Sequence, residues 1–462
     1  MSALDAKVAA AQTVGRLARR AGRGGGTSLP GKLLTRLAPD AIGQLANRLP
    51  EGCAVISATN GKTTTAAMVA SVLGRQGRRV VANRAGANMA GGVASALLDA
   101  ARWGGEIDGQ FGLFEVDEFW MDTVLPALEP RCVLLGNLFR DQLDRYGELE
   151  TIADRWAAMV AALPNETALA LNADDPLIAD LGRGRGAVTY FGIEDRSLAT
   201  PEMQHASDSK HCRNCGAAYV YEAIYLGHFG VYACPSCGRR RPAPTVSAHD
   251  VSLHGTRSAS FTLHVGEQAV AVQLPLPGLY NVYNALGAAA LCGTLGFTPA
   301  QIADGLEHVS AAFGRSERIA LGDHELAVLL IKNPAGANEV LRTLRLEHDG
   351  LDLLGILNDR TADGRDVSWI WDADFELLTP VVRRVTCSGT RAAELAVRFK
   401  YAGVDEDKLY VEHDLPAALD RALETASAEQ LFALPTYTAL LELRAELGRR
   451  GHVDSFWETA HR

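Results

Sequence analysis

Residues 53–73 contain an apolar run, a turn with Gly61, Lys62 and Thr63, and a second apolar stretch at helical spacing. The first run predicts a buried strand, and residues 66–73 predict a helix. A strand, a Gly-Lys-Thr turn and a helix together form a phosphate cradle, because the free N–H groups at the helix start point at the anion. Lys62 can then reach the β- and γ-phosphates, and the Thr63 hydroxyl can hold Mg²⁺. A chance Gly-Lys-Thr in a surface turn is the alternative, but both flanking elements favour binding of ATP or a close relative.

Strand-like runs alternate with helical patterns from residue 51 to about residue 191. After the first run, the candidate strands are residues 80–83, 111–116, 132–137 and 168–172. This alternation predicts a mostly parallel sheet with helices on both faces. Ligands of such sheets bind at the carboxyl ends of the strands. Lys62, Glu115, Asn137 and Asn172 are all expected at that edge.

At 462 residues the chain is too long for one hydrophobic core, so two or three domains are expected. We assign residues 1–48 to a basic helical N-terminal segment and residues 49–313 to a central ATP-binding domain. A change of domain is predicted near residue 314, and residues 314–462 are predicted to form a second, smaller α/β domain. Its candidate strands are residues 326–331, 351–357, 384–388, 408–412 and 429–434.

The segment Glu115-Val-Asp-Glu118 ends one of the predicted strands. A carboxylate at that edge, facing the phosphate cradle, suits a Mg²⁺ that bridges β- and γ-phosphates. A solvent-facing acidic loop is the alternative, which the spacing alone leaves open. The charged segment 137–147 follows another predicted strand, and its signal is weak when it is taken alone.

Four of the eight cysteines have the spacing of metal ligands. Cys212 and Cys215 form one CxxC pair, and Cys234 and Cys237 form a second pair after 18 intervening residues. Four thiolates suit tetrahedral Zn²⁺ and leave no open coordination position, so the metal is expected to be structural. Two disulfides are the alternative. We predict that the segment of about 203–243 is a zinc-ribbon insert in the central domain.

The remaining cysteines, the charge and the hydropathy limit where the protein can work. Those four cysteines stand singly in apolar runs, which together with the lack of a signal peptide or membrane span predicts a cytoplasmic protein. The net charge of −10 disfavours general nucleic-acid binding. Residues 1–37 differ, with seven Lys or Arg against one acid. Such a segment suits a solvated or docking helix, or weak attraction to the anionic inner face of a membrane.

Residues 358–372 hold four carboxylates and two tryptophans in a segment that is predicted to be a loop. Exposed Trp beside charge is typical of interfaces, and a loop Asp can orient a catalytic His that another chain supplies. A solvated acidic loop with its Trp side chains in the core is equally compatible with the pattern. Cys292 lies in the middle of a predicted helix among alanines, so the chain has no obvious glutaminase nucleophile of its own.

Several motifs occur in order and together resemble the Mur ligase family. They are residues 58–65, 115–118, 137–147, 172–176, 277–284 and 314–317. The cysteine insert, Lys332-Asn-Pro-Ala-Gly336, residues 358–372 and the short C-terminal domain further resemble the MurT branch of that family. The resemblance covers nearly the whole chain. It implies a Mur-type P-loop domain with the zinc ribbon inserted in it, followed by a smaller Rossmann-like C-terminal domain.

The resemblance also implies a reaction. The ATP-dependent enzyme of this branch phosphorylates the α-carboxylate of the D-glutamate in lipid II and amidates it to D-isoglutamine, a step of peptidoglycan synthesis. The ammonia would come from a GatD-type glutaminase, with which the chain would form a heterodimer. The residues agree with this expectation, because an ATP cradle is present and an ammonia source is not.

The family's motifs further imply roles for single residues. Phosphate binding falls to Asn60, Gly61, Lys62, Thr63 and Thr64, Mg²⁺ to Thr63 and Glu115, the adenine to Asn281, and the hinge near the phosphates to Arg315. Lys62 and Glu115 would serve the chemistry directly. Asp366 would complete a Cys-His-Asp triad whose Cys and His belong to GatD.

Two other functions share some of these features. An amino-acid-adding ligase of Mur or folylpolyglutamate type has the same cradle and carboxylates, but it gives no reason for the cysteine insert or for the loop that carries Asp366. A zinc-ribbon ATPase that acts on nucleic acid is disfavoured by the net charge of −10.

Overall fold

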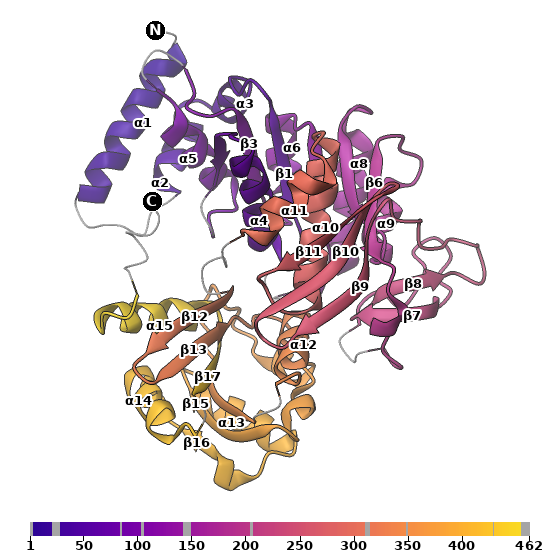
Figure 1. The fold of residues 1–462 in the computed structure, drawn as a ribbon. Helices are drawn as coiled ribbons and strands as arrows, with labels where there is room; N and C mark the ends of the chain where they lie inside the picture. Colours follow the sequence, from indigo (N-terminus) through magenta and orange to yellow (C-terminus); the bar gives the residue numbers. More distant parts are fainter. Residues whose placement is uncertain are drawn as a thin grey trace.

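Two large β-sheets and one small two-stranded sheet make up the described part of the chain in the computed structural model (Figure 1). The first sheet uses strands β1 to β6 and β9 to β11, and the second uses β12 to β17. The structure describes residues 3–20, 28–83, 86–102, 106–141, 149–203, 207–309, 315–347, 350–427 and 429–453.

The first sheet has nine strands in the order β11-β10-β9-β6-β5-β4-β1-β3-β2. Neighbours from β2 through β9 run parallel, whereas β9, β10 and β11 are antiparallel. The strand bounds are β1 Cys53–Ser57, β2 Val80–Ala82, β3 Phe111–Glu115, β4 Cys132–Leu135, β5 Ala168–Asn172, β6 Val188–Ile193, β9 Val246–His254, β10 Ser258–Val265 and β11 Gln268–Leu274. The predicted parallel sheet is thus confirmed. Strand-like runs in the sequence at residues 258–265 and 269–274 correspond to β10 and β11, whereas β6 and β9 are additions that the sequence pattern did not single out.

Helices cover both faces of this sheet and create two cores. One face carries α4 (Lys62–Arg75), α10 (Leu279–Thr294) and α11 (Pro299–Glu307). The other face carries α3 (Ala41–Ala46), α5 (Ala90–Ala100), α6 (Met121–Leu128) and α8 (Leu149–Ala162). A strand between two such layers is buried on both sides, which explains why β1 is an unbroken apolar run.

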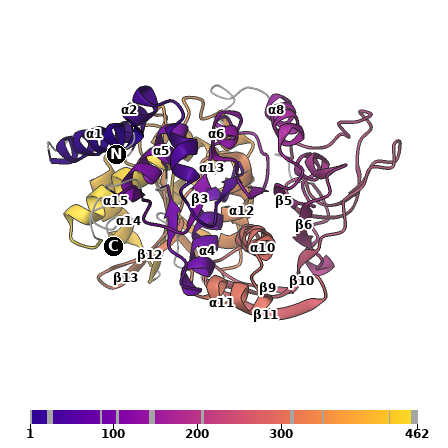
Figure 2. The ribbon, with the colours of Figure 1, turned by 90° about the horizontal axis from the view of Figure 1, so that it is seen from above.

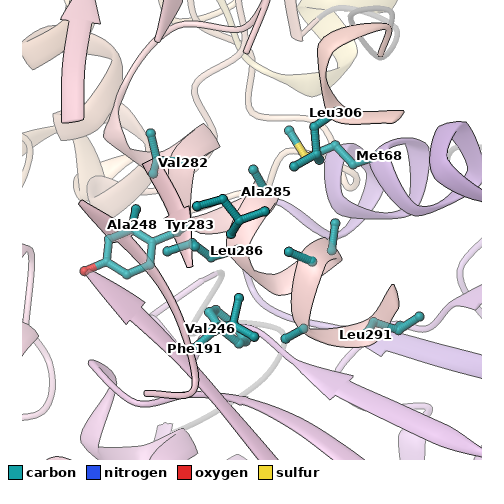
Figure 3. Packing of buried hydrophobic residues seen from close by; sticks show 14 of the residues in the cluster. Met68, Phe191, Val246, Ala248, Val282, Tyr283, Ala285, Leu286, Leu291 and Leu306 are labelled. Atoms are coloured by element: carbon teal, nitrogen blue, oxygen red, sulfur yellow. The ribbon is translucent and has the colours of Figure 1, made fainter. Parts of the chain in front are cut away.

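Helix α10 is the central helix of the first core. Every residue from Asn281 to Cys292 is buried, as expected for a helix that is apolar all round. Figure 3 shows side chains of α10 such as Leu286 packed with Phe191 and Val246 from the sheet. Burial raises the pKa of the Cys292 thiol, so this cysteine is a packing residue, as predicted.

The basic N-terminal segment docks on the second core. Helix α1 (Ala3–Arg20) packs through Leu4, Val8 and Ala11 beside α2 (Leu29–Leu37) and α5. Gln12 donates hydrogen bonds to the carbonyls of Leu98 and Ala101, at 2.9 and 2.8 Å. None of the described helices combines the length and the apolar character that crossing a bilayer requires.

The cysteine insert lies between β6 and β9. It forms a separate two-stranded sheet from β7 (Val220–Leu226) and β8 (Phe229–Ala233). Its cysteine end packs against Ala179 of α9 (Pro176–Ala179).

The second sheet has six strands in the order β12-β13-β17-β14-β15-β16, of which only β12 is antiparallel to its neighbour. The strand bounds are β12 Arg315–Leu321, β13 His324–Leu329, β14 Leu351–Ile356, β15 Val382–Ser388, β16 Leu409–Val411 and β17 Gln430–Pro435. Helices α12 (Pro334–Leu344) and α13 (Ala392–Tyr401) cover one face, and α14 (Leu415–Thr425) and α15 (Tyr437–Arg449) cover the other. Figure 1 shows α12 on the side of this domain that faces the first sheet, and in Figure 2, seen from above, α12 appears near α10, with which it lines the same cleft. Residues 310–314 lie outside the described part, so the boundary at 314 stays a prediction.

Candidate active site

The turn between β1 and α4 has the geometry of an anion cradle. Gly61 has φ +87°, and a Cβ at this position would lie 2.0 Å from Oδ1 of Asn284. A side chain here would be strained by the positive φ and would have to displace the Asn284 side chain, so the position favours glycine. Within the described part of the chain, no side chain caps the N-terminus of α4. The first N–H groups of that helix remain available to an anion.

Lys62 is buried at the start of α4 and pairs with a carboxylate of the segment Glu115-Val-Asp-Glu118. Its Nζ lies 2.7 Å from Oε2 of Glu118 and also donates to the Ala58 carbonyl. Burial lowers the pKa of Lys62, but the carboxylates of Glu118, Asp117 and Glu115 outweigh it, and the net pKa is raised. Burial raises the pKa of Glu118, but attraction to Lys62 and Lys332 dominates, and the net pKa is lowered. Both side chains are therefore charged, and a phosphate must compete with Glu118 for Lys62.

Glu115 ends β3 beside the cradle and is buried. Its backbone is fixed by Asn83, which accepts from the Glu115 N–H at 2.9 Å and donates to the Glu115 carbonyl at 2.8 Å. Among the described residues, the four cysteines are the only group of three or more side chains that converge as metal ligands. The residues here instead fit Mg²⁺ that arrives with a nucleotide, since such an ion needs one or two protein oxygens and takes the rest from phosphates and water. Thr63 and Glu115 are the two residues predicted to supply these protein oxygens.

Two residues of the C-terminal domain reach the cradle from the other side. Lys332 donates to the Thr59 carbonyl at 3.2 Å and pairs with Asp141 at 2.6 Å. The side-chain amides of Asn333 and Asn60 exchange hydrogen bonds of 3.0 and 3.3 Å. Sequence reasoning assigned these two residues no role in the site. The signal was the Asn-Pro pair itself, because Asn333 caps α12 and so places the helix end at the cradle.

A cleft opens between the two domains at this point. Asn60, Gly61 and Thr64 of the cradle line the cleft, and so does the predicted adenine residue Asn281. Asn281 donates to the Pro277 carbonyl at 2.7 Å and accepts from Asn284 at 3.0 Å. Apolar side chains form most of the rest: Phe139, Leu226, Phe229, Leu276, Tyr280, Tyr283, Leu329, Leu330, Ala335 and Val340. A cleft lined by residues of the cradle and by apolar and aromatic side chains suits a nucleotide.

The four cysteines converge at the open end of the β7–β8 hairpin. Their Sγ atoms lie within 4.8 Å of one another, with Cys212 3.6 Å from Cys237 and Cys215 3.4 Å from Cys234. These separations fit four thiolates around one tetrahedral metal ion. Hydrogen bonding from the Arg239 backbone, with further bonds from Asn214 and neighbouring thiols, lowers the pKa of Cys237 to about 6, which favours the thiolate that a metal requires.

Asp366 and Asp363 have different surroundings in the acidic loop of residues 358–372. Asp366 is exposed, and the hydrogen bonds from Ser368 lower its pKa, so it is ionised. Asp363 is buried and accepts from the backbone N–H of Thr438 at 2.7 Å, at the start of α15. A partner chain can reach Asp366 but not Asp363. Trp371 of the same loop is 49% exposed.

The structure therefore brings together part of the predicted site. Asn60, Gly61, Thr64 and Asn281 line the cleft, with Lys62 and Glu115 buried beside the cradle. Neither the cysteine cluster nor Asp366 is among the residues that line the cleft. Arg315 begins β12, but its side chain lies outside the described part, as does most of the charged segment 137–147.

Comparisons with known proteins show which class of proteins has this architecture. The Mur ligase middle domain matches residues 56–233, and the MurT ligase C-terminal domain matches residues 330–440. The pseudomurein peptide ligase type C of Methanothermus fervidus has a similar fold, with a TM-score of 0.65 at 22% identity over 87% of this chain and 79% of its own. The folylpolyglutamate synthase of Mycobacterium tuberculosis has a TM-score of 0.59 at 16% identity over 88% of this chain and 95% of its own. The fold is that of the Mur ligase class.

Two curated relatives show to which branch of this class the chain belongs. The protein from Streptococcus pneumoniae named lipid II isoglutaminyl synthase (glutamine-hydrolyzing) subunit MurT is 31% identical over 92% of this chain and 93% of its own length. Its namesake from Staphylococcus aureus strain N315 is 32% identical over 94% of this chain and 96% of its own length. The chain belongs to the MurT branch of the Mur ligase family.

Proposed function

We propose that this chain is the ATP-dependent synthetase subunit of a lipid II isoglutaminyl synthase. Its identity of 31–32% with the named MurT subunits, over more than nine-tenths of both chains, carries the proposal. The chain would activate the α-carboxylate of the D-glutamate in the lipid II stem peptide and amidate it to D-isoglutamine. We do not retain the amino-acid-adding alternative, because the two relatives described above, which are more than 30% identical over nearly the whole chain, are named as isoglutaminyl synthase subunits.

In the first step an oxygen of the substrate carboxylate attacks the γ-phosphorus of ATP, and ADP leaves. Lys62 and the N-terminal N–H groups of α4 hold the phosphates, with Asn60, Gly61 and Thr64 around them and Arg315 on the hinge. Mg²⁺, held by Thr63 and Glu115, would neutralise charge on the phosphate oxygens. The apolar walls of the cleft and Asn281 would receive the adenine. When a nucleotide binds, Lys62 would exchange its contact with Glu118 for contacts with the phosphates. Its positive charge would then face the negative charge of the phosphates, which happens only with nucleotide present.

In the second step ammonia attacks the acyl carbon, the C–O bond to phosphate breaks, and the nitrogen loses a proton. Water competes with ammonia for the acyl phosphate, so the site must be closed during this step. The contacts of Lys332 with Asp141 and of Asn333 with Asn60 support such closure, because they join the two domains directly at the cradle.

The chain would obtain its ammonia from a GatD-type glutaminase in a heterodimer. We assign Asp366 to a triad whose Cys and His belong to that partner, and its exposure and its ionised state support the assignment. The four cysteines would hold a structural Zn²⁺. The domain limits given above, the Rossmann-like character of the C-terminal domain, and contact of the basic N-terminal segment with the inner face of the membrane belong to the same proposal.

The substitution Asp366→Asn tests the division of labour. With the partner present, glutamine-driven amidation of lipid II should fall by about 10²-fold or more, because the partner His loses its orienting carboxylate. Amidation driven by ammonium salts should stay near that of the wild type. Asp372→Asn, an exposed Asp in the same loop, is the matched control and should change neither rate. Equal loss of both activities in Asp366→Asn would refute the assignment.

A further inference from the structure

The two ends of the β7–β8 hairpin have different surroundings. At the open end, Cys234 follows β8 directly, and the other three cysteines gather around it. At the turn end, Leu226 is the last residue of β7 and Phe229 is the first of β8, and both line the interdomain cleft. One short hairpin thus joins the cysteine cluster to the proposed nucleotide site.

The turn end is held firmly in place. The Phe229 ring lies 5.0 Å from that of Phe139 and 5.1 Å from that of Tyr283, so it stands between the loop after β4 and helix α10. Arg342 of α12 donates to the Tyr225 carbonyl at 3.2 Å. The turn therefore touches both domains beside the cleft, and its position sets the shape of the apolar wall.

A metal ion at the open end would add a cross-link to the contacts that this end already makes with Ala179. The hairpin is a sheet of its own with only two strands, and its ladder is irregular at two places. Isolated two-stranded hairpins are marginally stable. The four thiolates lie where the strands would separate, and a metal ion bound there would join the two strands.

We infer that the cysteine insert builds part of the wall that binds the nucleotide base, with Leu226 and Phe229 as the contact residues. The metal in the cysteine cluster then sets base affinity through the hairpin and does not affect phosphate binding. The ligand class that fits is a purine nucleotide, since the flat ring is received by apolar and aromatic side chains and by the amides of Asn281 and Asn284. This inference rests on the proposed ATP site and extends it.

A comparison of the binding of ATP with the binding of inorganic tripolyphosphate separates effects on the wall that binds the base from effects on the phosphate cradle. Both dissociation constants are measured by calorimetry on the purified full chain. In Phe229→Leu and in Leu226→Ala, the Kd of ATP should rise by about tenfold, while the Kd of tripolyphosphate stays unchanged. Lys62→Ala should raise both. Val220→Ala, at a position of β7 that is 61% exposed, is the matched control and should raise neither.

The role of the metal is tested with Cys237→Ser, at an exposed position of the cluster. This variant should lose bound zinc, keep its affinity for tripolyphosphate, and bind ATP about tenfold more weakly. If the metal acts through the wall, the double variant Cys237→Ser/Phe229→Leu should bind ATP no more weakly than the weaker of the two single variants. Melting temperatures identify any variant that fails to fold, and Leu226→Ala then carries the test in place of Phe229→Leu.

Three results are decisive. Unchanged ATP affinity in both folded wall variants overturns the inference. Zinc loss without a change in ATP affinity also overturns it, because the hairpin would then keep its place without the metal. A wild-type chain that binds neither ATP nor tripolyphosphate would instead refute the proposed function itself.

Discussion

The buried ion pair between Arg241 and Asp174 anchors the cysteine insert and allows a quantitative prediction. Arg241 follows the second CxxC pair, and its side chain is 7% exposed, whereas that of Asp174 at the end of β5 is fully buried. Nε of Arg241 lies 2.5 Å from Asp174, and the other guanidinium nitrogens contact Glu194 at 2.6 Å and the Ile193 carbonyl at 2.9 Å. The Tyr283 hydroxyl also donates to Asp174 at 2.7 Å.

The substitution Arg241→Met removes the cation and keeps most of the side-chain volume. Asp174 would then be a buried carboxylate with hydrogen bonds but no opposite charge, which typically costs about 3–5 kcal/mol of the free energy of unfolding. For a domain of this size, that loss corresponds to a fall in Tm of roughly 10 °C. Arg239→Met is the matched control, because Arg239 is 32% exposed and its partner Asp180 keeps a second contact with Arg183. Its cost should stay below about 1 kcal/mol.

The deficit of Arg241→Met should also depend on pH. Burial raises the pKa of Asp174 above its unfolded value, although attraction to Arg241 opposes this. A carboxyl with a raised folded pKa contributes stability that is present below its unfolded pKa and is lost as pH rises through its folded pKa. Without Arg241 that folded pKa rises further, so protonation of Asp174 should rescue the variant in mildly acid solution. The difference from the wild type should be smaller near about pH 5 than near about pH 8.

Urea unfolding of both chains and of the control, followed by circular dichroism at the two pH values, measures these differences. A loss below about 1 kcal/mol in Arg241→Met would show that the pair does not anchor the insert. A deficit of the same size at both pH values would show that the uncompensated charge of Asp174 is not its cause.

Two further predictions concern the cradle. Lys62→Ala should lower kcat by about 10²-fold or more with either ammonia or glutamine as the nitrogen source, because both routes need the same phosphate contact; retained turnover in a rate assay would remove Lys62 from the cradle. Asn333→Ala should raise the KM for ATP by about threefold to tenfold and cost about 1 kcal/mol of stability, because the substitution removes both the contact with Asn60 and the cap of α12. ATP saturation curves and thermal melts measure these effects, and a variant unchanged in both would argue against a closing role for this contact.

The sequence predicted the parts of the fold that depend on local pattern. Continuous apolar runs mark strands buried on both faces, so β1, β3, β4 and β5 were found within two residues of their bounds. The turn at Gly61 was marked by the same local pattern, because it lies between the adjacent strand and helix, and its role in phosphate binding stays a prediction. The spacing of the four cysteines likewise predicted their convergence, which the structure confirms.

Other features depend on contacts between distant segments. The pairing of Lys62 with Glu118 joins residues 56 positions apart, and sequence reasoning chose Glu115 from the same motif without assigning Glu118. The contribution of Leu226 and Phe229 to the cleft was missed, because the pattern marked the insert only by its cysteines. Burial separates Asp363 from Asp366, and spacing alone does not. In each case the tertiary fold decides which of several similar residues faces the site.

Helix α12 joins the two centres that the proposed reaction needs. At its N-terminus Asn333 contacts Asn60 of the cradle. One turn further along, Asn338 donates to the Asp374 carboxylate at 3.1 Å and accepts from the Asp374 backbone at 2.7 Å, just after the loop that carries Asp366 and Trp371. The nucleotide site and the exposed acidic loop therefore rest on one rigid element. By linkage, a partner that binds the loop more tightly when nucleotide is present must raise the affinity for nucleotide by the same factor. Activation of the carboxylate and supply of ammonia would be coordinated in this way without a residue common to both sites.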